Sequence, residues 1–166
     1  MPVGVAFGTT DGKTSYVPID NDVLLAQGLT LGTFKEIFGR VLEHKKPIKC
    51  GYDTKYMKHV FANVGINLAG VSDDVMLESY VLEAHRSHTI EKLAANWLKY
   101  ELRGEEELLG KGAKKLSFSQ VSVEKAAEFA SERVFIVSRL NRLFKKALSD
   151  DAKLEKIYRD IEMPLS

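Results

Sequence analysis

The stretch that decides the fold is Lys49-Cys50-Gly51-Tyr52-Asp53-Thr54-Lys55-Tyr56-Met57. Together with the preceding Ile48 it begins as a short apolar run, which is typical of a buried parallel strand. From about Asp53 to Asn63 the residues predict a helix, and Gly65 supplies its C-terminal stop. A strand that leads directly into a helix indicates an α/β domain. Cys50 falls in the strand, which favours a buried, inert thiol over a nucleophile.

Two strands and a helix are expected before this stretch. The strands span about 3–8 and 14–19 and are joined through Asp11-Gly12, a dipeptide typical of tight hairpin turns. Thr33-Phe34-Lys35-Glu36 matches a capping box and predicts the start of a helix. Its apolar face is expected to comprise Phe34, Ile37, Phe38 and Leu42.

After the stretch the pattern is mostly helical. Helices are expected at about 74–84, 90–99, 105–109, 123–148 and 152–162, the last two beginning after Ser122 and about Asp151. We find no repeat, low-complexity segment or interdomain linker. The sequence therefore predicts one α/β domain over residues 1–166, with strands first and a helical second half.

Composition sets modest limits on function. The chain has 166 residues, of which 45% are apolar, so it suits one folded domain rather than a disordered segment. Lys and Arg number 24 against 23 Asp and Glu, so overall charge does not indicate a nucleic-acid or membrane partner. With one cysteine, no signal peptide and no long apolar run, the expected location is the cytoplasm.

The central stretch belongs to a set of motifs that resembles a known family. The others are Gly70-Val71-Ser72-Asp73-Asp74-Val75-Met76-Leu77-Glu78-Ser79-Tyr80, Leu93-Ala94-Ala95-Asn96-Trp97-Leu98-Lys99 and Gly110-Lys111-Gly112. Together they resemble the 3′-to-5′ proofreading exonuclease domain of bacterial DNA polymerase I, over about Val3 to Leu165. The resemblance implies a ribonuclease-H-like fold, a mixed sheet flanked by helices, and a role in DNA replication and repair. It also implies a core at about 1–148 and a helix at 149–166 that leads toward a polymerase domain, which this chain lacks.

In this family two divalent metals, Mg²⁺ or Mn²⁺, hold the attacking and leaving oxygens of the 3′-terminal phosphodiester. Four carboxylates normally bind the metals. Two of them belong to an Asp-x-Glu pair on the first strand, and the chain matches the family only from the second strand onward. The third corresponds to Met57. The fourth belongs to a Tyr-x-x-x-Asp motif, whose tyrosine and aspartate correspond to Phe129 and Arg133.

These replacements oppose metal binding. The thioether of Met57 is a soft, neutral ligand, whereas magnesium selects hard oxygens. Arg133 places a cation where an anion is needed, and two unit charges about 4 Å apart repel by about 4 kcal/mol at an effective dielectric of about 20. We therefore expect no bound metal and no catalytic residue at Met57, Phe129 or Arg133. The alternative is an active metal-dependent 3′-5′ exonuclease with a displaced set of carboxylates.

Four acids are candidates for such a displaced set. Asp53 lies one helical turn before Met57, but it also suits the N-cap of the helix. Asp73 and Asp74 are neighbours, and both suit the start of the following helix. Glu132 is acidic in the family as well, and the simpler interpretation is an ion-paired surface residue. We favour the structural interpretation for all four.

Two further groups of residues lack a complete site. His85 and His88 could share a helix face, but no third metal ligand accompanies them. The segment Gly110-Lys111-Gly112 lacks the spacing of a phosphate-binding loop, which favours a solvated turn. Trp97, Leu93 and Phe118 are expected to be packing residues.

The resulting hypothesis is a noncatalytic exonuclease-like domain with a structural or DNA-guiding role. Its expected partners are single-stranded DNA, with Lys55 and Tyr56 as the contact residues, and a polymerase domain of the same or a related chain. Lys45, Lys46, Lys49 and Lys58 add to the local positive charge, although a solvated lysine-rich face explains them equally well. Without the family's first strand, neighbouring strands would keep unpaired edges, so we expect reduced stability or self-association.

Overall fold

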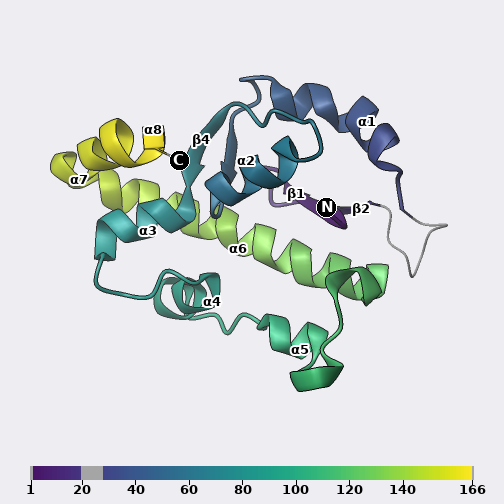
Figure 1. Ribbon diagram of the computed structural model, residues 1–166. Coiled ribbons are helices and arrows are strands. Elements are labelled where there is room, and N and C mark those ends of the chain that lie inside the picture. The colour runs from purple at the N-terminus through teal and green to yellow at the C-terminus, as the bar shows by residue number, and fades with distance from the viewer. Residues whose placement is uncertain (1, 20–27, 166) are drawn as a thin grey trace.

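A computed structural model describes residues 2–19 and 28–165, apart from the side chain of residue 113. It shows a mixed α/β fold whose first half carries all the described strands and whose second half is helical (Figure 1). This arrangement confirms the expected order of elements. Part of the loop expected before the first helix, residues 20–27, lies outside the described residues.

The N-terminal hairpin consists of β1 (Gly4–Gly8) and β2 (Thr14–Pro18), which pair antiparallel with Val5 opposite Val17. Gly12 has a φ of 89°, a conformation that few residues other than glycine adopt readily. This glycine allows the tight turn that the sequence predicts. Gly8 lies against α6 (Val123–Ser149), because a methyl group added to it would come within 2.5 Å of Val134.

The first helix, α1 (Leu31–Glu43), begins earlier than predicted. Its N-cap is Thr30, whose hydroxyl accepts from the Thr33 backbone, so the expected capping box at Thr33 is wrong. Phe34 is fully buried, but Ile37 is 54% exposed and does not share the buried face. The shift arises because Thr30 supplies the same capping oxygen three residues earlier.

The central stretch forms β3 (Lys49–Gly51) followed by α2 (Thr54–Ala62), as predicted. A parallel partner, β4 (Val71–Asp74), pairs with β3, and α3 (Val75–Glu83) follows it directly. β4 is missing from the sequence prediction because its two aspartates read as a helix start. Gly70 has a φ of 71°, and a Cβ atom added to it would lie only 2.4 Å from the Lys45 carbonyl oxygen.

The second half consists of helices around α6 (Figure 1). They are α4 (Ile90–Leu93) with the π-helical turn Ala94–Leu98, α5 (Glu105–Leu109), the 3-10 turns Gly112–Lys114 and Phe118–Gln120, α6, α7 (Ala152–Ile157) with the π-helical turn Tyr158–Glu162, and α8 (Met163–Leu165). Their bounds agree closely with the predicted ranges. Within the described chain, no helix combines the length and hydropathy needed to cross a membrane.

Helix α6 lies at the centre and joins the main cores. On one side it packs with α3 and α4 around a cluster that includes Leu93, Leu140 and Phe144. On the other side it contacts the hairpin, whose Val5 and Phe7 pack against the core of α1 and α2. Trp97 stacks edge-on against Phe144, with ring centroids 4.9 Å apart. A smaller core holds Leu109 and Val121, with Phe118 packed against it, so Trp97, Leu93 and Phe118 are packing residues as predicted.

The described strands form two separate two-stranded sheets, both of which contact α6. Ile19 N donates to Val3 O, and Thr9 N donates to Lys13 O, so odd-numbered residues of β1 face β2. By alternation, the backbone groups of Gly4, Ala6 and Gly8 face the other edge. Because each described sheet has only two strands, β1 and β3 each have one edge that pairs with no described strand.

Cys50 is exposed, which corrects the prediction of a buried thiol, and the neighbouring Ile48 is 69% exposed. The side chains of a strand inside a wider parallel sheet are usually covered by neighbouring elements. Among the described strands, β3 pairs with β4 alone, so it lies at the edge of its sheet. The apolar character of these residues therefore does not reflect burial in the described chain.

Candidate functional site

Met57 lies on α2 with its side chain half-buried against the core of the hairpin, α1 and α2. A methyl group added to Gly51 would come within 2.9 Å of the Met57 sulfur, so the thioether lies directly against β3. The position that the motifs predict to match a family aspartate therefore makes an apolar packing contact. A thioether in this place offers little to a hard cation.

Arg133 lies on the part of α6 that faces α4 and the loop before α5. Its Nη2 donates to the Glu91 carboxylate at 2.8 Å and to the Arg103 carbonyl oxygen at 2.8 Å. The guanidinium also sits 3.5 Å from the centre of the Phe129 ring. Burial lowers the pKa of Arg133 from its ordinary value, while Glu91 acts to raise it, and an arginine remains charged at neutral pH. Arg133 and Phe129 thus form a cation–π contact next to the ion pair of Arg133 with Glu91.

Asp53 caps α2, as predicted. Its carboxylate accepts from the Tyr56 backbone N–H at 3.2 Å, and the residue itself has a φ of 52°, in the left-handed region. Asp and Asn tolerate this conformation better than most other residues. Asp53 therefore serves as a helix cap on a strained turn between β3 and α2.

Asp74 also caps a helix, which confirms that prediction, and it does more than cap. Its buried carboxylate accepts from the backbone N–H groups of Met76 and Leu77 at the start of α3. It also accepts from the backbone N–H of Asp53 and from the backbone and hydroxyl of Thr54 at the start of α2. One carboxylate thus holds two helix N-termini together, so its lone pairs are already engaged.

Asp73 is not a helix cap, and that prediction is wrong. Its carboxylate is 1% exposed and forms ion pairs with Lys145 at 2.7 Å and Arg159 at 3.0 Å. Burial acts to raise its pKa, but hydrogen bonds from Lys145 and Ser72 outweigh it and the pKa is lowered. The last residues of β4 alternate, so Asp73 points toward α6 and the final helix while Asp74 points toward the helix starts.

Glu78 is a buried acid that the sequence analysis did not single out. It is fully buried on α3, and the Asn141 side-chain amide donates to its two oxygens at 3.0 and 3.1 Å. Burial raises its pKa to about 8, with the hydrogen bond from Asn141 opposing that rise and Asp73 adding to it. The sequence signal that could have identified Glu78 is an acidic residue within the apolar run of α3.

Glu132 is half-buried and accepts from the Tyr100 hydroxyl at 2.6 Å and from Arg103 Nε at 3.4 Å. The expectation of an ion pair is confirmed, with Arg103 rather than Arg133 as its partner. Asp53 and Glu132 therefore serve different local networks. Among the described residues, no group of three or more His, Cys, Asp or Glu side chains is arranged to hold a metal ion.

The histidine pair lies outside the helices, as the predicted helix ranges 74–84 and 90–99 imply. α3 ends at Glu83, so His85 and His88 fall in the following turn and loop. The Nδ1 of His88 lies 3.0 Å from the Ser79 hydroxyl, and its ring packs edge-on against Tyr80. Lys111, between the two glycines of the other candidate motif, pairs with Glu106 at 2.8 Å on the surface.

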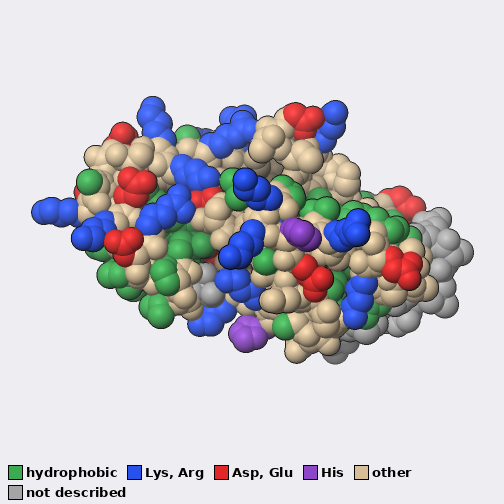
Figure 2. Space-filling view, turned by 90° about the horizontal axis from the view of Figure 1, so that it is seen from above, with side chains coloured by type: hydrophobic (Ala, Val, Ile, Leu, Met, Phe, Trp, Pro, Cys, Tyr) green, Lys and Arg blue, Asp and Glu red, His purple; other side chains and the backbone are tan. Residues whose placement is uncertain are grey.

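Positive side chains gather on the face that carries α2 and the approach to β3 (Figure 2). Lys45 and Lys46 are exposed in the segment between α1 and β3. Lys55 and Tyr56 are exposed in the first turn of α2, where Tyr56 is 66% exposed. The ammonium of Lys49 is already engaged, because it donates to the carbonyl oxygens of His44 and Pro47 at 2.7 and 2.9 Å. We call the lysines 45, 46 and 55 together with Tyr56 the α2 surface.

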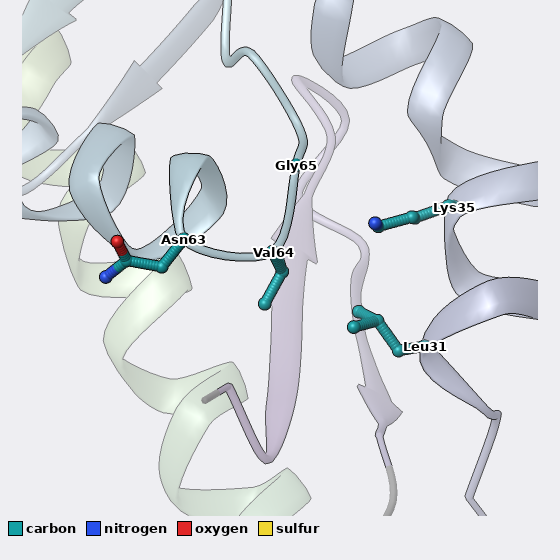
Figure 3. A pocket seen from close by; sticks show the side chains of 5 residues that line it. All are labelled: Leu31, Lys35, Asn63, Val64 and Gly65. Carbon is teal, nitrogen blue, oxygen red and sulfur yellow. The ribbon is translucent and has the colours of Figure 1, made fainter.

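A separate depression lies between the start of α1 and the end of α2 (Figure 3). Lys35 and Leu31 point toward Val64 and Gly65 across it, whereas Asn63 points away. Its lining contains one charged side chain, Lys35, and none of the candidate site residues. This depression therefore offers no group suited to nuclease chemistry.

The family model described as "DNA polymerase I, ribonuclease H-like domain" matches residues 3–140. The chain belongs to this family. It is 35% identical to the DNA polymerase I of Pseudomonas aeruginosa and 29% identical to that of Synechocystis, with 98% of the chain aligned in both. It spans 18% and 16% of those proteins, so they are much longer than this chain.

The polymerase I ribonuclease H-like fold is also seen in a solved structure described as "POL domain of Pol1 from M. smegmatis complex with DNA primer-template and dNTP". The TM-score is 0.73 at 21% identity, covering 98% of this chain and 24% of the other. This agreement confirms the ribonuclease-H-like fold that the sequence predicts. From the motifs, Met57 and Arg133 are predicted to stand where the family has metal-binding carboxylates.

Proposed function

We propose that this chain is a noncatalytic exonuclease-like domain of the polymerase I family, with a DNA-guiding or structural role in DNA replication and repair. The observation that carries the proposal is the engagement of Arg133 by Glu91, Arg103 and Phe129. A cation fixed there opposes a divalent metal, and the thioether of Met57 gives no compensating charge.

The remaining acids support the same conclusion. Asp53 and Asp74 satisfy helix N-termini, and Glu132 is bound by Tyr100 and Arg103. Recruiting any of them to a metal would expose backbone donors or break an ion pair. A displaced metal site would therefore compete with contacts that maintain the fold.

The DNA-guiding part of the proposal rests on the α2 surface. Exposed lysines attract the phosphate backbone, and an exposed tyrosine offers a ring on which a base can stack. Neither contact needs a metal. We therefore expect weak binding to single-stranded DNA that falls with salt and is unaffected by a chelator.

Fluorescence anisotropy of a labelled oligo-dT strand tests this part directly, with and without EDTA and over a series of salt concentrations. Replacing Lys45 and Lys46 with serine should weaken binding and reduce the slope of log K against log salt by about 1.4, since each single-strand phosphate contact contributes about 0.7. Tyr56→Ala should weaken binding about ten-fold.

The matched control replaces Lys114 and Lys115, an exposed neighbouring pair near α5, with serine. Binding by this control should equal that of the unaltered chain. Equal losses in both pairs, or binding that EDTA abolishes, would contradict a DNA-guiding surface on α2. A complete lack of binding would leave only the structural role.

A further inference from the structure

The exposed face of α6 carries charges of opposite sign in its two halves. Five of its exposed residues are spaced at intervals of four and seven, so they lie in one line along the helix. They are Glu124, Glu128, Phe135, Arg142 and Lys146, and we call them the α6 strip. The acids of the strip lie before Phe135 and the bases lie after it. Phe135 is 45% exposed, so an apolar ring stands at the middle of the strip.

The order of charges in the α6 strip is self-complementary. Glu128 and Arg142 each lie seven residues from Phe135, and Glu124 and Lys146 each lie eleven residues from it. A second strip placed antiparallel and centred on Phe135 therefore sets every acid against a base of the other copy. A two-fold contact requires this pattern, because the same patch meets itself and each pair of residues occurs twice.

The central charges of the strip are accessible to another chain. The Glu128 side chain is 67% exposed, and its pair with Arg103 is a surface one, 3.6 Å long. Arg142 Nη2 donates to the Thr10 carbonyl oxygen at 2.6 Å, which positions the guanidinium but uses only part of its five N–H donors. Both charges are thus held at the surface, where they can pair with groups of a second copy.

The helix that carries the strip is already fixed in place. α6 has 27 residues and crosses the molecule from the turns after α5 to the start of α7 (Figure 1). Its opposite face includes Leu140 and Phe144, which are both fully buried. The strip covers about 33 Å of this helix, at about 1.5 Å per residue. Pairing through it would therefore order little besides side chains, which lowers the entropic cost of association.

We infer that two copies of this chain pair through the α6 strip, antiparallel, with the two Phe135 rings in contact at the two-fold axis. Aromatic pairs and cross-helix ion pairs are contacts that such helix pairs use. A uniformly acidic or uniformly basic partner fits less well, because one half of the strip would repel it. The neighbouring bases Lys125 and Lys145 lie about 80° to either side of the line, since successive residues are about 100° apart, and Lys145 pairs with Asp73.

This contact differs from strand pairing at the edge of β1, since it uses side chains of α6 and no backbone group of the hairpin. It also goes beyond the proposed function, because the α2 surface, Met57 and Arg133 take no part in it. The two proposals can therefore fail independently.

An exchange of charges tests the contact. Self-association is measured by biolayer interferometry, with one copy immobilised and the other in solution. Glu128→Arg sets two bases against each other twice in every pair, and Arg142→Glu does the same with two acids. Each variant should bind itself about ten-fold more weakly than the unaltered chain binds itself. The two variants should bind each other like the unaltered chain, because opposite charges then meet at both contacts.

The matched control is Glu36→Arg, which reverses an exposed acid on α1. It should bind itself as the unaltered chain does, and circular dichroism shows whether each variant is folded. Added salt should weaken the pairing of the unaltered chain, because exposed ion pairs are screened. No self-association of the unaltered chain, an equal loss in the control, or a mixed pair no tighter than the like pairs would overturn the inference.

A cross-link tests the two-fold axis itself. Phe135→Cys in a Cys50→Ser chain places the only thiol at the axis, where it meets its copy and should form a disulfide-linked dimer under mild oxidation. Ile37→Cys in the same background, at a position on α1 that is 54% exposed, should stay monomeric. Adding Ala6→Pro should leave the Phe135→Cys dimer unchanged. Equal dimer yields at both positions, or loss of the dimer on adding Ala6→Pro, would contradict the α6 contact.

Discussion

Arg133 and Glu91 form an ion pair 2.8 Å long between α6 and the first turn of α4. The contact joins two helices of the second half, at the position that the motifs predict to match a metal-binding aspartate of the family. Arg133, whose charge would repel a metal ion, therefore also stabilises the packing of α6 against α4. This pair makes the change at Arg133 part of the packing of the domain.

The first prediction concerns Arg133. Arg133→Met keeps much of the side-chain volume on Phe129 but removes the donors to Glu91 and Arg103, so it should lower the free energy of unfolding by about 1–3 kcal/mol. Urea unfolding followed by circular dichroism measures the change. Arg86→Met, which removes only the surface pair with Glu83, should cost less than about 1 kcal/mol. Equal costs would show that the Arg133 network adds nothing beyond a surface pair.

The second prediction compares two helix caps. Asp74 receives hydrogen bonds from the starts of both α2 and α3, whereas Asp151 caps α7 alone on the surface. Asp151→Ala should cost about 1 kcal/mol, and Asp74→Ala about 3 kcal/mol or more because it leaves buried donors unpaired. Thermal or urea unfolding of the two variants gives the comparison. A similar loss in both would refute the double role of Asp74.

The third prediction is a pH dependence caused by Glu78. Burial raises its pKa from 4.5 to about 8 in the folded chain. The stability that its protonated form contributes is fully present below pH of about 4.5 and is lost as pH rises through about 8. The free energy of unfolding should therefore fall over this window, by at most about 1.4 kcal/mol per pH unit. Asp73 has a lowered pKa, so its own effect lies at lower pH.

Glu78→Gln keeps an oxygen to accept from Asn141 but does not ionise. Unfolding of this variant, measured from about pH 5 to about pH 9, should show a flatter profile than the unaltered chain. The sign of the slope decides the matter. Stability that rises with pH in the unaltered chain, or an unchanged slope in the variant, would contradict a buried, protonated Glu78.

The fourth prediction concerns the strand edges. The backbone groups of Ala6 face away from β2, so this edge can pair with another strand. Light scattering should show self-association that grows with concentration. Ala6→Pro removes a donor from that edge without breaking a bond to β2, and it should reduce the association. A stable, monodisperse monomer would count against the reduced stability or self-association expected from the sequence.

Much of the fold was predictable because local signals agreed with it. Gly12 marks the hairpin turn, Asp53 and Gly65 delimit α2, and Ser122 starts α6. Two of the failures, the expected burial of Cys50 and of Ile48, share a physical origin. Cys50 and Ile48 are apolar but exposed, because burial of a strand depends on neighbours that the strand's own residues do not encode.

The altered positions Met57, Phe129 and Arg133 stay a prediction from the motifs. Their contacts could not be predicted from the sequence. The pairing of Arg133 with Glu91 and the burial of Glu78 on Asn141 join residues that are 42 and 63 positions apart. Asp73 and Asp74 were indistinguishable in sequence, and only the alternation of β4 separates their roles.

Nucleotide release from a 3′-labelled DNA single strand, with Mg²⁺ or Mn²⁺ and an EDTA control, tests the central claim most directly. We predict no release above the EDTA control, because Met57 and Arg133 leave the metals without ligands. Release that EDTA abolishes and that Asp53→Asn or Glu132→Gln reduces would contradict this account. It would show that a displaced carboxylate set has restored the nuclease.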